Sequence, residues 1–195
     1  FYIEGDEVYH EEDLEKILKS MELHLNNSKV EALVFDFKHF YGNANTLLDS
    51  PGWYRTEARI IKNSVRSYAP DGLFWLVLGS NKKGRYPLAK HTGASCYHYG
   101  WVRSEDQMNL KSAKVQKYWG SEPIRIDYTQ MDQSIIRPFQ GTHPKIVENW
   151  LPKDIGIFEV DPSYKLTQKQ KNHRLKIKIE KLFSIDLSKK HFKLV

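Results

Sequence analysis

The spacing of apolar residues predicts four helices in this chain. Residues 104–119 are expected to form one helix, with Ser104 as its N-cap, and residues 144–151 a short one. Residues 167–183 have the pattern of a basic amphipathic helix. Near the start, residues 11–26 carry apolar side chains at three- and four-residue intervals, which is typical of a helix with one buried face. These side chains are Leu14, Ile17, Leu18, Met21 and Leu25.

Short apolar runs predict strands between these helices. Residues 30–37 indicate a buried strand, and residues 53–62 a second one. Residues 73–78 and 86–90 are expected to pair as a hairpin. Residues 95–99 form a further short run of strand-forming residues.

Two stretches lack a clear helix or strand pattern. Residues 42–52 are rich in Gly, Asn, Asp and Pro, which predicts a loop, and residues 124–140 are expected to form a linker. Because strands alternate with helices, the fold class is predicted to be α/β or α+β, with a mixed sheet flanked by helices. We expect one domain over residues 1–155 and a basic helical extension over residues 156–195.

Composition and charge restrict the class further. Hydrophobic residues make up 40% of the 195 residues, enough for a core, which excludes a globally disordered chain. The formal charge is +6, and the excess of Lys and Arg lies in residues 165–195. This basic tail favours an anionic partner such as a membrane surface, nucleic acid or anionic polymer, and a solvated helix face is the alternative.

Several other classes lack their sequence signals. The single cysteine, Cys96, excludes an internal disulfide and fits a reducing compartment. No apolar run approaches the roughly 20 residues that a membrane span requires. The chain has no Walker-type phosphate loop, no serine nucleophile elbow and no zinc-binding Cys/His spacing.

The start of the chain carries the most informative polar pattern. Glu4 and Asp6 are separated by Gly5, and on an extended chain their side chains would point to the same side. Gly5 would let a ligand approach the backbone closely. Two converging carboxylates suit Mg²⁺ or Mn²⁺, with a diphosphate supplying further ligands. The alternative is an acidic turn that leads into the first helix.

Five segments, in order, resemble motifs of bacterial family 2 glycosyltransferases of the GT-A type. The resemblance covers residues 1–150 and fades after about residue 155. The segments are residues 2–11 (YIEGDEVYHE), 37–42 (FKHFYG), 53–63 (WYRTEARIIKN), 97–103 (YHYGWVR) and 141–144 (GTHP). The resemblance implies a GT-A-like fold whose nucleoside-binding strands lie upstream of Phe1. A chain that starts without Met on Phe-Tyr-Ile agrees with missing upstream sequence.

The resemblance also implies a metal site. Glu4 and Asp6 would hold Mn²⁺ or Mg²⁺ against the pyrophosphate of a nucleotide-sugar donor. The family's first position is usually Asp, so Asp6 is a firmer ligand than Glu4. His98 is the candidate third ligand, because GT-A enzymes often bring a His from a late strand to the metal. An aromatic-core histidine between Tyr97 and Tyr99 is the equal alternative.

The remaining roles follow from the same resemblance. Asp71 and then Glu57 are the candidates for the base that deprotonates the acceptor hydroxyl, although Asp71 also suits a plain turn. Aromatic rings stack on sugars and Arg binds phosphate, with core packing or surface ion pairs as alternatives. The donor-binding candidates are Arg55 and Arg59, and the substrate-binding candidates are Tyr41, Trp53, Trp101 and Arg103.

These expectations define a function. The sequence predicts a metal-dependent, inverting glycosyltransferase that moves a sugar from a nucleotide-sugar donor to a saccharide or lipid-linked acceptor. The expected location is cytoplasmic, with peripheral contact at the inner membrane face, and no nucleic acid partner is expected. One alternative is a non-catalytic relative that binds nucleotide or carbohydrate. A second is an anionic-surface binder that works through the Lys-rich tail.

Overall fold

The computed structural model of the chain describes residues 1–80, 83–118, 120, 122, 125–151 and 159–195. It separates into two compact units. Unit 1 comprises Phe1–Lys38, Gly52–Tyr97 and Ser188–Val195, and unit 2 comprises His39–Pro51 and His98–Leu187. The expected boundary at residue 155 lies outside the described residues. The expected extension differs from the structure, because residues 188–195 belong to unit 1.

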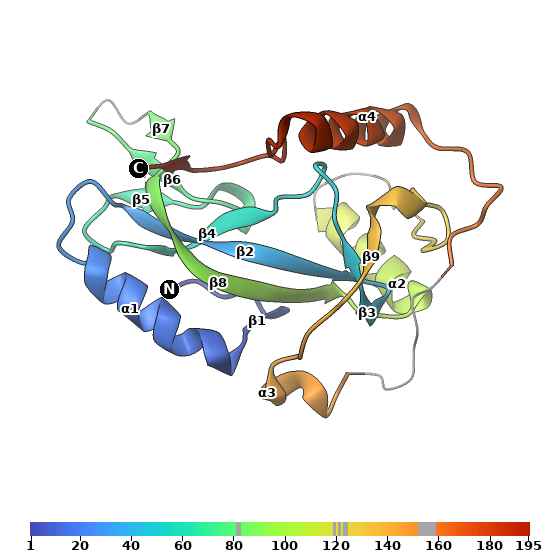
Figure 1. Cartoon of the computed structure of the whole chain (residues 1–195), viewed down its shortest axis with the longest axis horizontal. Helices are drawn as coiled ribbons and strands as arrows, with labels where there is room; N and C mark the ends of the chain where they lie inside the picture. Colours follow the sequence, from blue (N-terminus) through green and yellow to red (C-terminus); the bar gives the residue numbers. More distant parts are fainter. Residues whose placement is uncertain (81–82, 119, 121, 123–124, 152–158) are drawn as a thin grey trace. The chain divides into compact units, whose positions relative to one another are not determined.

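Unit 1 is built on a mixed sheet, as the alternation of strands and helices predicts (Figure 1). Strand β8 (Leu88–Trp101) pairs with β1 (Glu7–Tyr9) and with β2 (Ala32–Tyr41). Strand β4 (Thr56–Ile61) lies antiparallel to β2, and β10 (Lys193–Leu194) lies parallel to β8. Both β2 and β8 contribute residues to each unit.

A small second sheet contains the expected hairpin with a shifted second strand. Strand β6 (Leu76–Leu78) pairs antiparallel with β5 (Ser67–Tyr68) and with β7 (Gly84–Arg85). The prediction of residues 86–90 as the second strand of this hairpin is therefore wrong. The later segment instead enters β8, a single strand of 14 residues that also contains the short strand expected at residues 95–99. Polar residues within β8 hide its length in the hydrophobic pattern.

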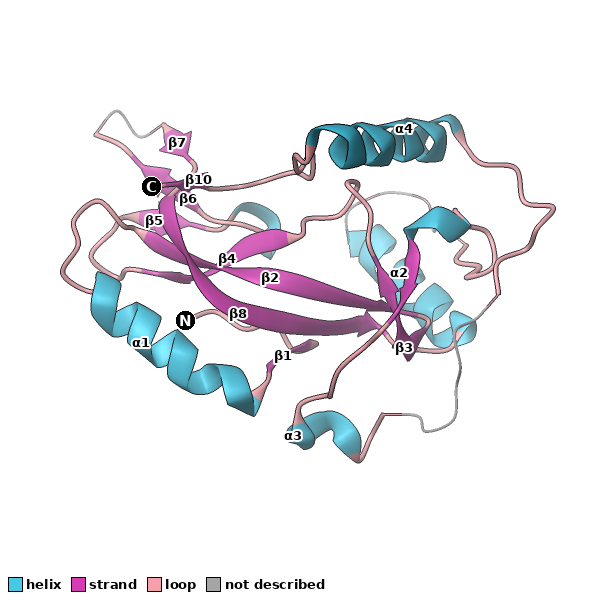
Figure 2. Ribbon diagram, viewed as in Figure 1, coloured by secondary structure: helices cyan, strands magenta, loops and turns pink. Residues whose placement is uncertain are grey.

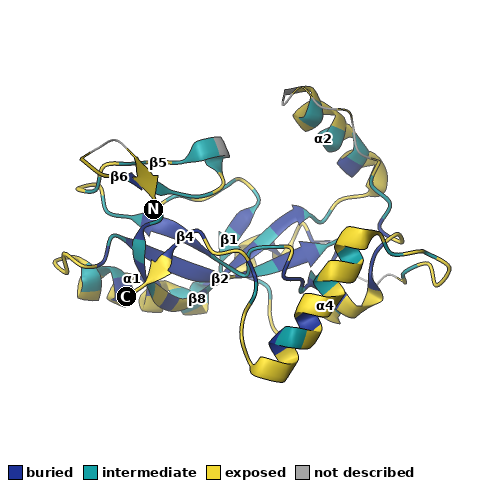
Figure 3. Ribbon diagram, turned by 90° about the horizontal axis from the view of Figure 1, so that it is seen from above, coloured by how far each residue is buried: buried dark blue, intermediate teal, exposed yellow. Residues whose placement is uncertain are grey.

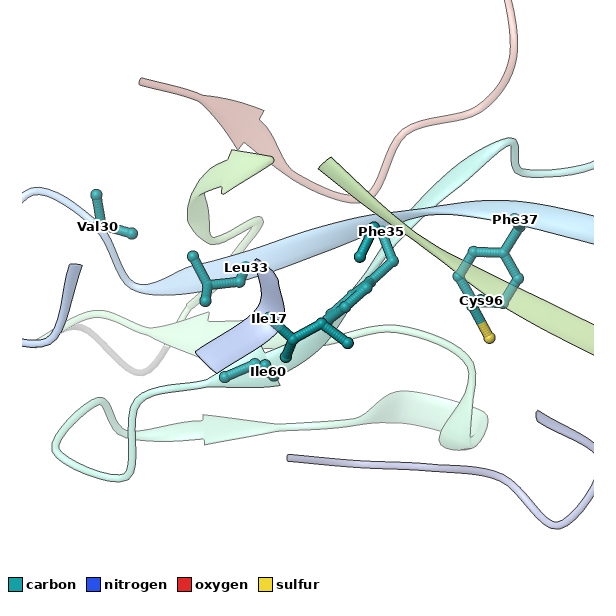
Figure 4. Close-up of a cluster of buried hydrophobic side chains, with 8 residues drawn as sticks. Ile17, Val30, Leu33, Phe35, Phe37, Ile60 and Cys96 are labelled. Carbon is teal, nitrogen blue, oxygen red and sulfur yellow. The ribbon is translucent and has the colours of Figure 1, made fainter. Parts of the chain in front are cut away.

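Alternating side chains of β2 form the core of unit 1 on one face. Leu33, Phe35 and Phe37 pack with Ile17 of α1 (Leu14–His24), as the close-up in Figure 4 shows. Figure 2 shows α1 alongside β8. The helix follows a short 3₁₀ turn, η1 (Glu11–Asp13), in agreement with the predicted amphipathic helix. Because side chains alternate along a strand, the other residues of β2 face the opposite side of the sheet.

The opposite face of β2 is covered by the last residues of the chain. Ala32 and Val34 pack in a cluster with Ala58, Ala89 and Phe192, whose side chain is buried. Backbone bonds from Lys193 N to Pro87 O (2.9 Å) and from Val195 N to Ala89 O (3.1 Å) tie this segment to β8. The first part of β2, residues 32–35, is thus buried on both faces, which explains its continuous apolar run.

Unit 2 contains a strand where the sequence predicts a loop. β3 (Asn43–Leu48) pairs with the end of β2 and with β9 (Ile136–Pro138), so the expectation of a loop over residues 42–52 is wrong for its first half. Gly42 supplies the positive φ of 73° at the turn between β2 and β3. β9 likewise corrects the linker expected at residues 124–140, of which residue 124 lies outside the described residues.

The helices of unit 2 lie where the sequence predicts them. α2 (Glu105–Tyr118) begins after Ser104, whose hydroxyl accepts a bond from Gln107 N at 3.3 Å. The expected end of this helix at residue 119 lies outside the described residues. α3 (Lys145–Glu148) is one short turn. α4 (Gln168–Phe183) begins with a capping box between Thr167 and Gln170.

Much of the surface of α4 is exposed to solvent. Ile177 and Glu180 are its buried residues, and Figure 3 shows its exposed side in yellow. A 3₁₀ turn, η3 (Gln133–Ile135), precedes β9. Among the described residues, every helix is too short or too polar to cross a lipid bilayer.

Candidate functional site

The acidic start of unit 1 is a turn rather than an extended strand. Glu7 N donates to Glu4 O at 3.1 Å, and Glu4 N donates to the Glu7 carboxylate at 3.3 Å. Gly5 and Asp6 form the turn between them, and β1 begins only at Glu7. The extended geometry expected for Glu4 and Asp6 is therefore wrong, because these reciprocal bonds close the chain on itself. The turn still carries both carboxylates.

A buried ion pair anchors this turn to the sheet. Arg59 of β4 donates from Nε to both Glu7 oxygens (3.0 and 2.9 Å) and from Nη2 to Glu7 Oε1 (2.6 Å). The side chains of Arg59 and Glu7 are 1% and 0% exposed. Arg59 Nη2 also lies 3.5 Å from Glu4 Oε1. Arg59, a donor-phosphate candidate, is thus engaged in holding the acidic turn.

The charge of this pair is favoured by its surroundings. Burial alone would lower the pKa of Arg59, but the hydrogen bonds and charge of Glu7, with the charge of Glu4, raise it instead. Arg59 also packs over the Phe37 ring, with its guanidinium carbon 4.8 Å from the ring centroid. The guanidinium is therefore charged at every pH at which the protein folds, and the turn has a permanent cationic anchor.

The two candidate bases have different surroundings. Glu57 is 0% exposed, and its carboxylate bonds to His191 Nδ1 and accepts from Ala58 N at 2.8 Å. The His191 ring stacks on Phe74, with centroids 4.2 Å apart. The oxygens of Glu57 thus face the interior of unit 1. Asp71 lies in a 3₁₀ turn, η2 (Pro70–Gly72), and its side chain lies outside the described residues.

Two further candidates of unit 1 lie near the start of β4. Trp53 and Arg55 are both half-buried. The carbonyl of Arg55 accepts a bond from Phe37 N at 2.8 Å, which ties this segment to β2. Their backbone is therefore fixed beside the sheet.

In unit 2, the predicted ligand His98 is part of a histidine pair. His98 Nδ1 lies 3.0 Å from His39 Nδ1, and the rings meet edge to face. His39 is 2% exposed, whereas His98 is half-buried. At this distance one Nδ1 donates and the other accepts, so the two rings fix each other's tautomer. His98 is thus oriented by His39, a residue that the sequence reasoning did not single out.

The predicted sugar-stacking residues of unit 2 come together. Tyr41 stacks on Trp101 with ring centroids 5.3 Å apart, and Tyr128 meets Tyr41 edge-on. The Tyr128 hydroxyl donates to the carbonyls of Trp101 and Arg103, each at 3.0 Å. Burial raises the pKa of Tyr41 to about 12, so its hydroxyl stays protonated. Arg103, the last substrate-binding candidate, is exposed.

The segment 141–144 contributes a second histidine cluster to unit 2. His143 Nδ1 lies 2.9 Å from the Tyr99 hydroxyl, and its ring packs against Phe40 and Phe139 with centroids 5.1 and 4.7 Å away. Phe40 and Tyr99 stack in parallel at 4.7 Å. An aromatic frame therefore holds the ring of His143, which lies in the predicted segment 141–144.

Metal-binding capacity is limited to small donor sets. Within the described ranges, no group of three or more His, Cys, Asp or Glu side chains is arranged to hold a metal ion. Glu4 and Asp6 supply two carboxylates from one turn.

Glu7 is not among the site residues predicted from the sequence. The signal was Arg59 within an apolar strand, because a buried Arg requires a carboxylate partner.

Comparisons with protein-family models, with curated proteins and with solved structures give no match to this chain.

Proposed function

We propose that this chain is the metal- and acceptor-binding part of a glycosyltransferase that uses a nucleotide-sugar donor. The observation that carries the proposal is the turn over residues 4–7, which the buried Glu7–Arg59 pair fixes and which presents Glu4 and Asp6. The five ordered segments that resemble family 2 glycosyltransferases are the reason for proposing sugar transfer as the reaction.

The donor set fits a hard divalent cation. Mg²⁺ is commonly bound by one or two carboxylates together with substrate phosphates rather than by an all-protein cage. Glu4 and Asp6 meet this requirement from one turn, with Glu4 held near Arg59. When bound, the cation would neutralise the diphosphate of the donor as the glycosidic bond breaks. The hydrogen bonds of the turn fix the backbone that carries the two carboxylates, which reduces the reorganisation that binding requires.

The other roles are proposed for each unit by itself. Tyr41 and Trp101 form a stacked aromatic pair that suits the flat face of a sugar. Because the Glu57 carboxylate is buried against His191, the role of general base is assigned to Asp71. His98, which lies against His39 through Nδ1, is proposed as a contact to the sugar and not as the predicted third metal ligand, because the described residues contain no group of three metal-ligating side chains. The transfer is inverting in this proposal, with one carboxylate deprotonating the attacking hydroxyl.

The exposed side of α4 supports a membrane-linked acceptor. It combines basic side chains with exposed apolar ones, the composition of helices that lie on anionic bilayers. The exposed apolar residues are Leu175 (59%), Leu182 (76%) and Phe183 (63%). Basic residues alternate with them, namely Lys169, Lys171, Lys176, Lys178 and Lys181. An acceptor carried by a lipid would reach the protein at such a surface.

A transfer assay tests this proposal. The protein, together with the upstream nucleoside-binding strands that the resemblance implies, is incubated with UDP-sugars and GDP-sugars with and without Mn²⁺, and the release of nucleoside diphosphate is measured. The proposal expects metal-dependent release that is lost in Asp6→Asn and kept in Glu15→Gln, an exposed carboxylate of α1. Equal release without metal, or full activity of Asp6→Asn, would contradict it. Metal-dependent binding without release would favour a non-catalytic relative.

A further inference from the structure

Unit 2 contains a polar pocket that the roles above do not use. Its volume is about 350 Å³, near the lower end of the range for small-molecule sites. Ala44 and Leu151, both buried, give it an apolar base. Its polar lining residues are Asn45, Thr142, His143, Glu148 and Asn149. The pocket therefore brings together β3, the segment before α3, and α3 with the residues after it.

The walls of the pocket are fixed by the backbone. Phe139 N donates to Asn45 O at 2.8 Å, which joins the two sides. Gly141 adopts φ of 141°, and a Cβ at this position would lie 3.3 Å from the Phe139 ring. Any other residue there would strain the chain that carries Thr142. On the far side, Val147 is buried and accepts bonds from Trp150 N and Leu151 N, each at 3.1 Å.

The His143 ring enters the pocket with a defined orientation. Its Nδ1 is bonded to the Tyr99 hydroxyl, and the Phe40 and Phe139 rings enclose its faces. A ligand would therefore meet a ring that is already ordered, at little further cost in side-chain entropy. Trp150 lies beside this frame. It is 55% exposed and meets Tyr99 edge-on at 5.7 Å.

The lining chemistry points to a neutral ligand with many hydroxyl groups. Amide, hydroxyl and imidazole side chains can both donate and accept hydrogen bonds, and the Glu148 carboxylate accepts them, which together suits the hydroxyls of a sugar. Among the described lining residues there is no Lys or Arg, so a phosphate or sulfate would enter without a compensating cation. Trp150 lies between the lining residues Asn149 and Leu151 in the sequence, and its exposed ring suits the apolar side of a sugar ring.

We infer that this pocket binds a single sugar residue of the acceptor saccharide, with Glu148 and Asn149 bonding its hydroxyl groups and Trp150 stacking on its ring. Sugar binding itself rests on the pocket alone, whereas its role as the acceptor subsite rests on the proposed transferase function. The predicted aromatic pair Tyr41–Trp101 is a separate surface and is not part of the pocket lining.

The test measures sugar binding without metal or nucleotide. Methyl glycosides of glucose, galactose and N-acetylglucosamine are titrated at millimolar concentrations into isotope-labelled protein, and amide and indole NMR shifts are followed. At least one glycoside should shift the signals of Thr142, Asn149 and Trp150. Inorganic phosphate should leave them unchanged. Methylamine serves as the probe for an amine that binds Glu148 alone.

Variants of exposed residues keep the test independent of folding. Glu148→Gln with Asn149→Ala should weaken glycoside binding by about tenfold, the loss expected for removed hydrogen bonds. Trp150→Ala should weaken it further, and Gln168→Ala on α4, outside the lining, should bind like the original protein. Glycosides that shift no pocket signal, equal binding by the double variant, or a response to phosphate or methylamine in place of sugars would overturn the inference.

The outcomes also separate this inference from the proposed function. Glycoside binding without any metal-dependent nucleotide binding keeps the sugar site and overturns its acceptor role. Metal-dependent nucleotide binding without glycoside-induced NMR shifts supports the proposed transferase function and contradicts sugar binding in the pocket.

Discussion

The Glu7 carboxylate and the Arg59 guanidinium form a fully buried bidentate ion pair, with Arg59 Nη2 2.6 Å from Glu7 Oε1. The pair joins the first turn of the chain to β4. It also determines where Glu4 and Asp6 lie, because Glu4 N bonds to the same carboxylate. A charge interaction inside unit 1 therefore supports the carboxylates to which we assign metal binding.

Removing Arg59 should destabilise the protein strongly. Arg59→Met would leave the Glu7 carboxylate buried without its partner, which typically costs about 3–5 kcal/mol of unfolding free energy. Urea denaturation followed by fluorescence measures the change. Combining Glu7→Gln with Arg59→Met should recover part of the loss, since no buried charge then remains. A loss below about 1 kcal/mol for Arg59→Met would show that the pair does not anchor the turn.

The bond between Glu57 and His191 should hold the C-terminal segment on unit 1. His191→Phe keeps the stacking on Phe74 but removes the Nδ1 partner of a carboxylate that is 0% exposed. We expect a loss of about 1.5–3 kcal/mol, the range for hydrogen bonds to charged groups. Limited proteolysis should then remove residues 188–195 faster. Lys189→Ala, an exposed neighbour, is the control, and equal stability of both variants would contradict this role.

The ion pair of Glu31 with Arg85 predicts a pH-dependent contribution to stability. Hydrogen bonds from Arg85 and from Leu88 N lower the pKa of Glu31 below its ordinary value of 4.5. A lowered folded-state pKa gives stability that is present above 4.5 and is lost as the pH falls through the folded value. Glu31→Gln should therefore cost about 0.5–1 kcal/mol at pH 7, given that Arg85 is half exposed.

The same substitution should have little effect at low pH. Denaturation of Glu31→Gln and of the original protein at pH 7 and near pH 3 gives the comparison. The difference should shrink at the lower pH, because the stability that the lowered pKa of Glu31 contributes is lost progressively as the pH falls below 4.5. A difference that stays constant or grows on acidification would show that the charge of Glu31 contributes nothing.

Much of the secondary structure follows from the sequence, because local signals and packing agree. The apolar spacing of α1 matches the buried position of Ile17, and the start of α4 is fixed by Thr167 and Gln170, three residues apart. β3 was missed because Asn and Thr occupy buried strand positions there. Thr46, for example, is 0% exposed, although a polar residue in such a segment usually indicates a loop.

The candidate site could be predicted only in its residue types. Glu4 and Asp6 stand out in the sequence, but their turn depends on Glu7 and on Arg59, which is 52 residues away. The burial of Glu57 depends on His191, 134 residues further along the chain. Hydrophobic periodicity does not predict such long-range pairs, because the pairs are determined by the arrangement of the sheet and not by neighbours in sequence.

The basic face of α4 should bind anionic bilayers. The protein is expected to sediment with vesicles that contain phosphatidylserine, less so as salt rises, and weakly with neutral vesicles. Lys171→Glu with Lys178→Glu should weaken binding by about 2 kcal/mol or more, at about 1 kcal/mol for each removed lysine. Arg174 is left unchanged because it pairs with Asp132. Equal binding to neutral vesicles, or no effect of the reversal, would remove α4 as the membrane contact.

Calorimetric titration with UDP and with GDP, with and without Mn²⁺, decides whether the turn over residues 4–7 holds a metal–diphosphate site. The titration uses the protein together with the upstream nucleoside-binding strands that the resemblance implies. We expect one nucleotide to bind only with the metal, and Asp6→Asn to weaken this binding at least tenfold, because loss even of an outer-shell partner costs about 10–100-fold in metal affinity. Glu15→Gln should bind like the original protein. Nucleotide binding that is equally strong with and without Mn²⁺, or that is unchanged in Asp6→Asn, would contradict a metal–diphosphate site on the turn over residues 4–7.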